Sequence, residues 1–90
     1  MMVAHVIISG FVHGVGFRRF VKNKAKKLGL FGWIRNLPDG RVDALLQGKK
    51  ETIGEIILLC KKGPFLSEVK DVRVNFEDTK ITYDSFDIIP

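Results

Sequence analysis

Residues Ser9–Arg19 read SGFVHGVGFRR and mark the point where the chain changes from an apolar strand to a basic helix. The preceding residues, Val3–Ser9, are rich in Val and Ile, which is typical of a strand. From Phe17 onward the apolar residues recur at helical spacing. The glycines between these segments predict a tight turn, so the chain is expected to begin with a strand, a turn and a helix.

This turn has the features of an anion site. Main-chain N–H groups of a glycine-containing turn can point inward together, and the unpaired N–H groups and positive dipole of a helix start add to them. Gly10, Gly14 and Gly16 bracket the turn, and no carboxylate lies between Gly10 and Pro38. In the first helical turn, Arg18 opposes the helix dipole at a cost of up to about 1 kcal/mol unless an anion offsets it. Because a guanidinium matches phosphate oxygens, the turn predicts a phosphate site.

The rest of the chain alternates between strands and helices. Gly29 is predicted to end the first helix in a left-handed conformation, and Pro38-Asp39-Gly40 to form a turn between two strands. The second helix is expected to begin at Thr52-Ile53-Gly54-Glu55, which matches a capping box, and to end at Gly63-Pro64. The predicted strands after the first helix span residues 31–37, 41–47 and 72–76, with a short edge strand around 86–88.

This order predicts the fold class. A strand, a helix, two strands, a helix and a strand, with a short extra strand, form the split βαβ or ferredoxin-like pattern. We expect one α+β domain over residues 1–90, a ferredoxin-like α/β sandwich whose antiparallel sheet of four to five strands carries two helices on one face. The same architecture hosts enzymes, RNA binders, metal carriers and regulatory domains, so the fold alone does not give the function.

Composition limits the class of protein further. The single cysteine, Cys60, excludes an internal disulfide and a cysteine-based zinc site, which favours a reducing, cytoplasmic setting. The longest apolar run, Ile56–Cys60, is far too short to cross a bilayer. Up to Lys62 the chain has twelve Lys and Arg residues against four Asp and Glu, within a net charge of +5. This surplus attracts anions, but on its own a solvated helix face explains it more simply.

Three further polar residues are candidates for the site. Asn36 ends the second predicted strand on the same face as Ile34, and its amide can hold a water, although Asn is also common at strand ends. From the residues alone these two explanations are evenly balanced. His13 in the turn could act as an acid, base or phosphate donor, or it could fix the loop through main-chain hydrogen bonds. His5 is expected to be a packed or partly exposed strand residue. Two such histidines make a poor metal site, so no metal is assigned.

The chemistry implied needs neither a protein base nor a covalent nucleophile. No Ser-His-Asp set is supported by spacing, and Asp39 and Asp43 lie near the predicted hairpin, where turn and strand-edge roles suffice. Phosphoryl transfer can proceed by positioning and charge stabilisation when the leaving group departs without help. A carboxylate, with a pKa of about 4–5, is such a leaving group. A mixed carboxylic–phosphoric anhydride meets this requirement.

At these residues the sequence resembles the acylphosphatase family. Residues Gly10–Arg18, GFVHGVGFR, look like the family's phosphate-binding loop. Gly32–Asn36, GWIRN, followed by Gly40-Arg41-Val42 and Gly48, look like its second signature at the same spacings. The resemblance covers essentially the whole chain. It implies hydrolysis of the carboxyl–phosphate bond of acyl phosphates without metal or cofactor, with inorganic phosphate as product and competitive inhibitor.

The resemblance also implies a role for each site residue. Arg18 would hold the phosphoryl oxygens together with main-chain amides of the loop, and Asn36 would orient the attacking water. The loop residues whose backbone would contact phosphate are His13, Gly14, Val15, Gly16 and Phe17. The family usually has Gln where this chain has His13, often a basic residue at Phe11, and Val, Ala or Cys at Ile34. Of these departures, His13 could alter the hydrogen bonding of the loop or add a pH dependence.

Two other classes of function remain to be distinguished. An RNA-recognition domain would stack bases on aromatic residues of its two central strands, but Val3–Ser9 and Arg41–Gln47 contain none. A regulatory domain could bind an anion in the same loop without chemistry, yet it has no need of Asn36 aimed at a water. A metal carrier would need a Cys-x-x-Cys pair. No linker precedes the end at Pro90, so a free-standing enzyme is expected. Separately, we expect a monomer that binds neither nucleic acid nor membrane.

Overall fold

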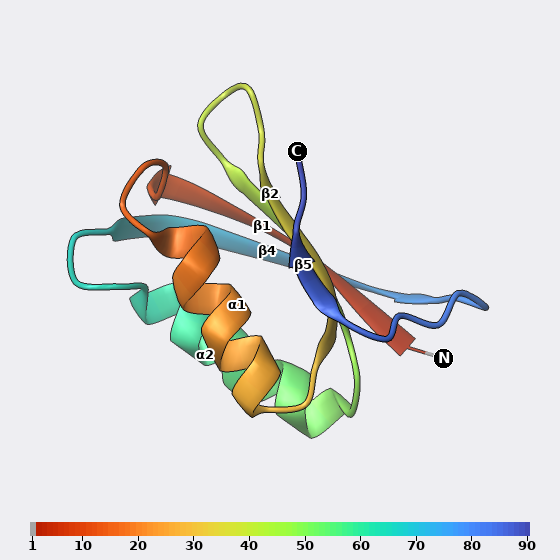
Figure 1. Cartoon of the computed structure of the whole chain (residues 1–90). Coiled ribbons are helices and arrows are strands. Elements are labelled where there is room, and N and C mark those ends of the chain that lie inside the picture. Colours follow the sequence, from red (N-terminus) through yellow and green to blue (C-terminus); the bar gives the residue numbers. More distant parts are fainter. Residues whose placement is uncertain (1) are drawn as a thin grey trace.

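The computed structural model describes residues 2–90, which form a five-stranded sheet covered on one face by two helices (Figure 1). The strands lie in the order β4-β1-β3-β2-β5. Their bounds are β1 (Met2–Phe11), β2 (Phe31–Asn36), β3 (Val42–Gln47), β4 (Glu68–Asp78) and β5 (Phe86–Ile88), and those of the helices are α1 (Phe17–Lys27) and α2 (Lys50–Lys62). The predicted ferredoxin-like α+β fold is confirmed.

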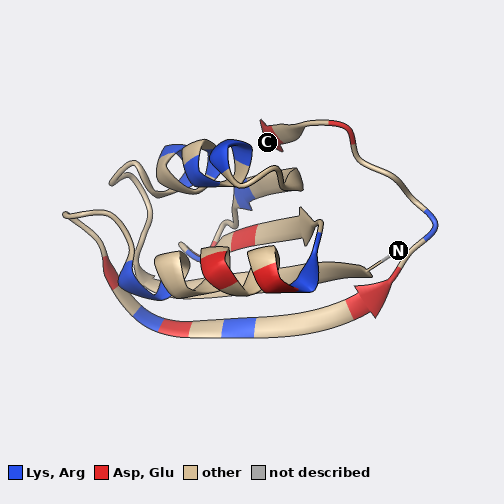
Figure 2. Cartoon of the chain, turned by 90° about the horizontal axis from the view of Figure 1, so that it is seen from below, with Lys and Arg blue, Asp and Glu red and all other residues tan. Residues whose placement is uncertain are grey.

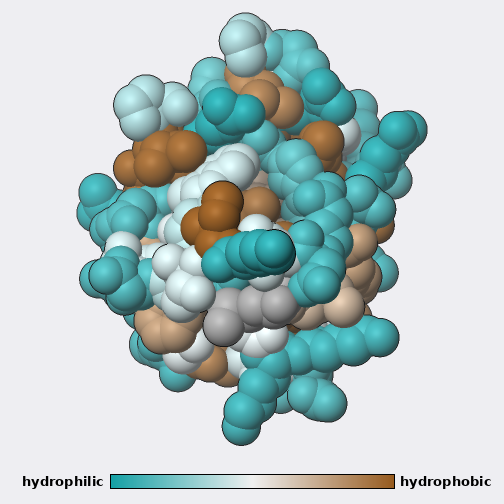
Figure 3. All heavy atoms as spheres, turned by 90° about the vertical axis from the view of Figure 1, so that its right-hand side faces the viewer, coloured by the Kyte–Doolittle hydropathy of each residue, from teal (hydrophilic) through white to brown (hydrophobic). Residues whose placement is uncertain are grey.

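The prediction of an antiparallel sheet does not hold for β5, and the sheet is mixed because of the route that the chain takes into this strand. The four longer strands pair antiparallel, whereas β5 runs parallel to β2. β4 ends beside the start of β1, where Asp78 pairs with Met2. The segment 79–85 then passes across the ends of the strands, from the edge strand β4 to the opposite edge. There β5 begins, where Phe86 pairs with Gly32 at the start of β2. On this end of the molecule hydrophobic residues form separate spots among hydrophilic ones (Figure 3).

A buried glutamine holds the crossing segment in place. Gln47 at the end of β3 is 2% exposed. Its Nε2 donates to the carbonyl of Ile81 and its Oε1 accepts from the main-chain N–H of Tyr83, both at 2.8 Å. Because burying an amide is costly unless both ends are hydrogen-bonded, this arrangement satisfies Gln47 and fixes the path into β5 at once.

The core lies between the sheet and the two helices. Alternate strand residues point toward the helices, and each helix contributes an apolar stripe. The buried residues on these surfaces include Ala4, Val6 and Ile8 of β1, Ile34 of β2, Val42, Ala44 and Leu46 of β3, Phe17, Val21 and Ala25 of α1, and Ile53, Ile56 and Cys60 of α2. Their burial pins both helices against one face of the sheet.

The end of α1 follows the prediction. Gly29 adopts a φ of 70°, its N–H donates to the carbonyl of Lys26, and the N–H of Leu30 donates to the carbonyl of Ala25. This is the hydrogen-bond pattern of a left-handed glycine cap.

Lys24 lies on the apolar side of α1, where a charged residue interrupts the stripe. Its Nζ lies 5.7 Å from the ring centroid of Phe20, so the aromatic face accommodates the cation.

The predicted start of α2 is wrong by three residues, because the capping box would make Thr52 the N-cap. The helix begins at Lys50 with Lys49 as its N-cap, and no side chain caps it. Ile53 N–H donates to the carbonyl of Lys49 at 2.9 Å, so Thr52 lies inside the first turn and the capping box does not form. Only two residues separate Gln47 from the helix, because the pinned end of β3 leaves the chain little length before α2 must cover the core.

The turn between β2 and β3 is confirmed. Gly40 has a φ of 90°, and its N–H donates to the carbonyl of Leu37 at 3.1 Å. Asp39 accepts hydrogen bonds from the main-chain N–H and the Nε of Arg41. The main-chain hydrogen bond is the largest cause that lowers the pKa of the Asp39 carboxyl below its ordinary value.

Replacing glycine by alanine is expected to change the stability of the fold in opposite directions at Gly32 and Gly54. Gly32 in β2 has a φ of 132°, and a Cβ there would collide with the carbonyl oxygen of Leu45. Gly32→Ala is expected to destabilise the fold by at least about 2 kcal/mol. Gly54 lies inside α2, where a Cβ meets nothing within 4 Å, so Gly54→Ala is expected to add about 0.5–1 kcal/mol. Denaturant unfolding measures both changes in the free energy of unfolding. Changes of the same sign in the two variants would contradict this explanation.

Burial of Cys60 predicts an unreactive thiol. Its side chain packs inside the core, and desolvation raises the pKa of the thiol from 9.0 to about 12. Because the pKa of this thiol is higher in the folded state than in the unfolded state, the unfolded state ionises first. The stability present below pH 9 is therefore lost as the pH rises toward 12. We expect a thiol reagent at neutral pH to label Cys60 only at the rate of unfolding. Immediate labelling of the native protein would show that the thiol is accessible.

Candidate active site

The loop between β1 and α1 turns through two left-handed glycines. Gly14 and Gly16 have φ values of 74° and 78°, and Gly16 is the N-cap of α1. A Cβ at either position meets no protein atom within 4 Å, so within the protein these glycines serve the left-handed backbone conformation. Val12 and Phe17, each 1% exposed, anchor the two ends of the loop in the core.

This loop presents main-chain donors that lack protein acceptors. Within residues 2–90, no hydrogen bond from the main-chain N–H groups of residues 14–19 is recorded. The first bond of the helix runs from the N–H of Phe20 to the carbonyl of Gly16, at 3.0 Å. The first turn of α1 holds no acidic residue. The helix start therefore offers several donors and an uncompensated positive dipole to an anion.

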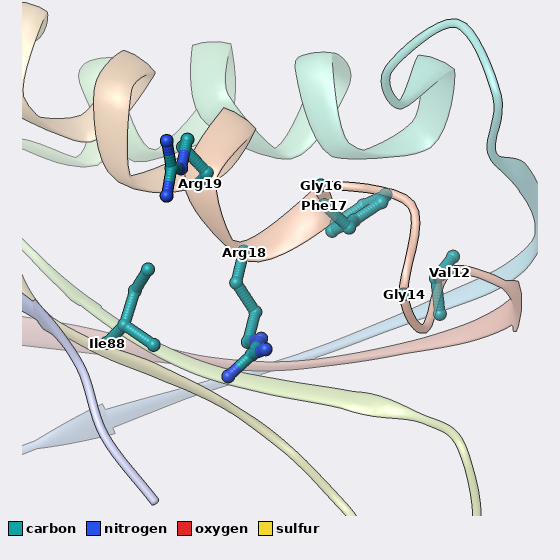
Figure 4. Close-up of a pocket in the computed structure, with 7 residues that line it drawn as sticks. All are labelled: Val12, Gly14, Gly16, Phe17, Arg18, Arg19 and Ile88. Atoms are coloured by element: carbon teal, nitrogen blue, oxygen red, sulfur yellow. The ribbon is translucent and has the colours of Figure 1, made fainter.

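A shallow pocket of about 230 Å³ lies against these donors (Figure 4). Its lining residues are Val12, Gly14, Gly16, Phe17, Arg18, Arg19 and Ile88. Arg18 extends from the start of α1 toward the sheet. Figure 2 shows the positive residues of α1 without an acidic residue among them. The glycine loop therefore borders a pocket with positive charge on one side.

The structure brings together most, but not all, of the predicted site residues. Gly14, Gly16, Phe17 and Arg18 line the pocket, whereas the other loop residues, His13 and Val15, do not. The His13 side chain is exposed, and no hydrogen bond to it is recorded within residues 2–90. The alternative in which His13 fixes the loop through the main chain is therefore not seen.

Asn36 lies outside the pocket lining but at the same edge of the sheet. β1 and β2 both run antiparallel to β3 and so point in the same direction, with Asn36 opposite Val42 and Val42 opposite Ile8. Three residues after Ile8, β1 ends and the glycine loop begins. Asn36 shares the helix-covered face with buried Ile34, as predicted. Its Oδ1 is buried and has no hydrogen-bond partner within residues 2–90.

Three residues that line the pocket were not predicted as site residues: Val12, Arg19 and Ile88. Arg19 follows Arg18 by one residue, about 100° around the helix; it is exposed, and it also lines the pocket. Ile88 reaches the pocket because β5 runs parallel to β2, with Ile88 opposite Ile34. Only the long-range pairing of β5 brings Ile88 here, so no local sequence signal could have indicated it.

Asp43 has a different role from the one expected. The turn role is correct for Asp39, but Asp43 lies on the central strand β3 and is 3% exposed. On the face opposite the helices, its Oδ1 accepts from His5 Nε2 at 2.5 Å and its Oδ2 accepts from Arg35 Nε at 3.0 Å. Arg35 immediately precedes Asn36, so this ion pair joins β2 to β3 beside the candidate site.

Loss of the Asp43 carboxylate is expected to destabilise the fold. Asp43→Ala leaves the Arg35 guanidinium and the His5 ring without their shared acceptor, but both side chains are partly exposed, so we expect a loss of about 1–3 kcal/mol in denaturant unfolding. Asp71→Ala is the matched control, because its ion pair with Arg73 is mostly exposed and such pairs contribute about 0–1 kcal/mol. A similar loss in both variants would show that burial of Asp43 is unimportant.

Fold and pocket together define a ferredoxin-like sandwich with a glycine turn between its first strand and first helix, whose main-chain donors face a positively charged pocket. The acylphosphatase family model matches residues 4–88. Acylphosphatase from Syntrophobacter fumaroxidans is 45% identical over 85 residues, covering 94% of this chain and 88% of that protein. The crystal structure of acylphosphatase from Bacillus subtilis superposes with a TM-score of 0.96 at 34% identity, covering all of both chains. An acylphosphatase structure from Coxiella burnetii gives 0.92 at 32% identity, covering 98% of this chain and 92% of that one.

The chain therefore belongs to the acylphosphatase family, and the predicted enzyme class is confirmed. Within residues 2–90 no helix is long and apolar enough to span a bilayer. The same residues contain no group of three or more His, Cys, Asp or Glu side chains placed to hold a metal ion.

Proposed function

We propose that this acylphosphatase hydrolyses acyl phosphates by holding the phosphoryl group against the glycine loop and directing a water at phosphorus. In this proposal Arg18 and the main-chain N–H groups of residues 14–18 bind the phosphoryl oxygens. Asn36 orients the water. Family membership supports the reaction, and the donors without acceptors in the loop support the binding mode.

The buried oxygen of Asn36 is the observation that carries the proposal. A buried acceptor without a partner costs about 1–3 kcal/mol, and natural proteins keep few of them. A water that donates one proton to Oδ1 satisfies this atom and keeps its own lone pairs free for attack. Because Asn36 lies at the edge where β1 leads into the loop, such a water would approach a phosphoryl group bound there.

The reaction then needs no protein base. The water oxygen bonds to phosphorus, the bond between phosphorus and the acyl oxygen breaks, and its electron pair leaves on the carboxylate. A proton of the water passes to the phosphate or to solvent. The carboxylate departs without a general acid because of its low pKa, and the positive loop stabilises the charge on the phosphoryl oxygens.

The same binding mode sets the other properties of the proposed enzyme. Inorganic phosphate has the same oxygens as the bound phosphoryl group and would compete for the loop. One copy of the chain supplies Arg18, Asn36 and the loop, so the proposal requires only a monomer that acts on a small molecule. It requires no metal or cofactor, and a cytoplasmic setting suits the single reduced Cys60.

The roles of Asn36 and Arg18 predict different kinetic losses. Asn36→Ala is expected to lower kcat on benzoyl phosphate about 10²-fold or more with KM nearly unchanged, because a water-orienting group acts in the chemical step. Arg18→Ala is expected to lower kcat/KM by a similar factor and to weaken competition by inorganic phosphate. Absorbance assays with chelator present measure both.

Matched variants keep this test sharp. Lys22→Ala removes a cation one turn later on α1 that does not line the pocket, and it should leave the rate nearly unchanged. Full turnover by a folded Asn36→Ala variant would refute the water-orienting role. Phosphate binding without turnover in the wild type would favour a regulatory anion-binding domain instead.

A further inference from the structure

We infer that Arg19 selects acyl phosphates whose acyl part carries a second anionic group, such as another carboxylate or phosphate. This inference rests on the proposed function, in which the phosphoryl group occupies the loop beside Arg18. It concerns the acyl group, which leaves as a carboxylate, and it predicts that a negatively charged acyl group is preferred to a neutral one.

The first support is the pairing of the arginines across the molecule. The chain has five, and three of them hold a carboxylate on a neighbouring residue or strand. These pairs are Arg35 with Asp43, Arg41 with Asp39, and Arg73 with Asp71. The remaining two, Arg18 and Arg19, have no recorded ion pair or side-chain hydrogen bond within residues 2–90, and both line the pocket.

The second support is the direction of the two free guanidinium groups. In Figure 4 Arg18 points from α1 toward the sheet, whereas Arg19 points a different way from the next position of the helix. A phosphoryl group bound by Arg18 and the loop therefore leaves Arg19 available to a different part of the same ligand. Both arginines lie at the positive end of the α1 dipole, where the first turn holds no acidic residue. A bound anion would therefore lower the electrostatic energy of both cations.

Ile88 completes the acyl side of the pocket. Val12 and Phe17 are 1% exposed and offer a ligand almost no apolar surface, whereas Ile88 is 38% exposed. The pairing of Ile88 with Ile34 and the bond from Ile89 N–H to the carbonyl of Ile34, at 2.9 Å, hold it at the pocket. The carbon skeleton of the acyl group would contact Ile88, and an anionic group at its far end would reach Arg19.

The expected effect is modest because Arg19 is exposed. A solvent-accessible charge pair changes an equilibrium or rate constant about 2- to 5-fold and weakens as salt is added. The preference therefore appears as a ratio of kcat/KM values between two substrates, and not as loss of all activity.

The test compares aromatic acyl phosphates that differ only in a distant charge. Benzoyl phosphate measures the basal reaction. The 3- and 4-(carboxymethyl)benzoyl phosphates present a carboxylate in two directions. Their methyl esters are neutral controls of similar size, and the intervening methylene group keeps the electronic effect of either form on the leaving carboxylate small. Each is assayed with the wild-type enzyme and with the Arg19→Gln, Arg19→Lys and Lys26→Gln variants. Lys26→Gln removes an exposed cation of the same helix that does not line the pocket.

We expect the wild type to prefer at least one carboxylated substrate over its methyl ester about 2- to 5-fold in kcat/KM. Arg19→Gln should abolish the preference, Arg19→Lys should retain part of it, and Lys26→Gln should leave it unchanged. Raising the ionic strength should reduce it. A wild type that turns over benzoyl phosphate without preferring either carboxylated isomer would overturn the inference. So would a preference that survives Arg19→Gln, or one that Lys26→Gln removes equally.

The two proposals fail in different ways. Absence of turnover of benzoyl phosphate by the wild type would overturn the proposed function and this inference with it. Normal turnover of benzoyl phosphate with no effect of charge at Arg19 would overturn only the inference.

Discussion

The candidate site depends above all on the pairing of β3 with both β1 and β2. Because both neighbours run antiparallel to β3, they end at the same edge of the sheet. β1 continues there into the glycine loop, and β2 ends there in Asn36. The ion pair between Arg35 and Asp43 joins β2 to β3 one residue earlier. A change in the register of β2 by one residue would move Asn36 to the opposite face, so the chemistry relies on this alignment.

Positive charge without protein partners is the second feature of the site. The main-chain donors of the loop, the start of α1, Arg18 and Arg19 all lie on one pocket, and no carboxylate of the described chain pairs with either arginine. Positive groups held close together destabilise the fold when no anion is bound. Elsewhere in the chain arginines are paired with carboxylates, as Arg41 is with Asp39 and Arg73 with Asp71. Local rules of stability are commonly broken at functional sites, and this pocket fits that pattern.

Much of the fold follows from local patterns. The glycine turn, the left-handed end of α1 at Gly29 and the turn at Gly40 each rest on a backbone conformation that glycine adopts at little cost. The start of α2 was misplaced because a capping box is a weak local signal, and the fixed end of β3 at Gln47 overrides it. Gly32 was assigned to a family signature by resemblance, and the structure adds a physical reason, since a Cβ there would meet the carbonyl of Leu45.

The sequence by itself determined the elements, the class of fold and the chemistry of the loop, because helical period, turn residues and a helix start without acids are local properties. The tertiary structure alone decided which distant residues meet. It brought Ile88 to the pocket through parallel pairing, buried Asp43 between two strands and enclosed the oxygen of Asn36. Those outcomes depend on register and strand order, which arise from packing of the whole chain and leave no mark at the residues concerned.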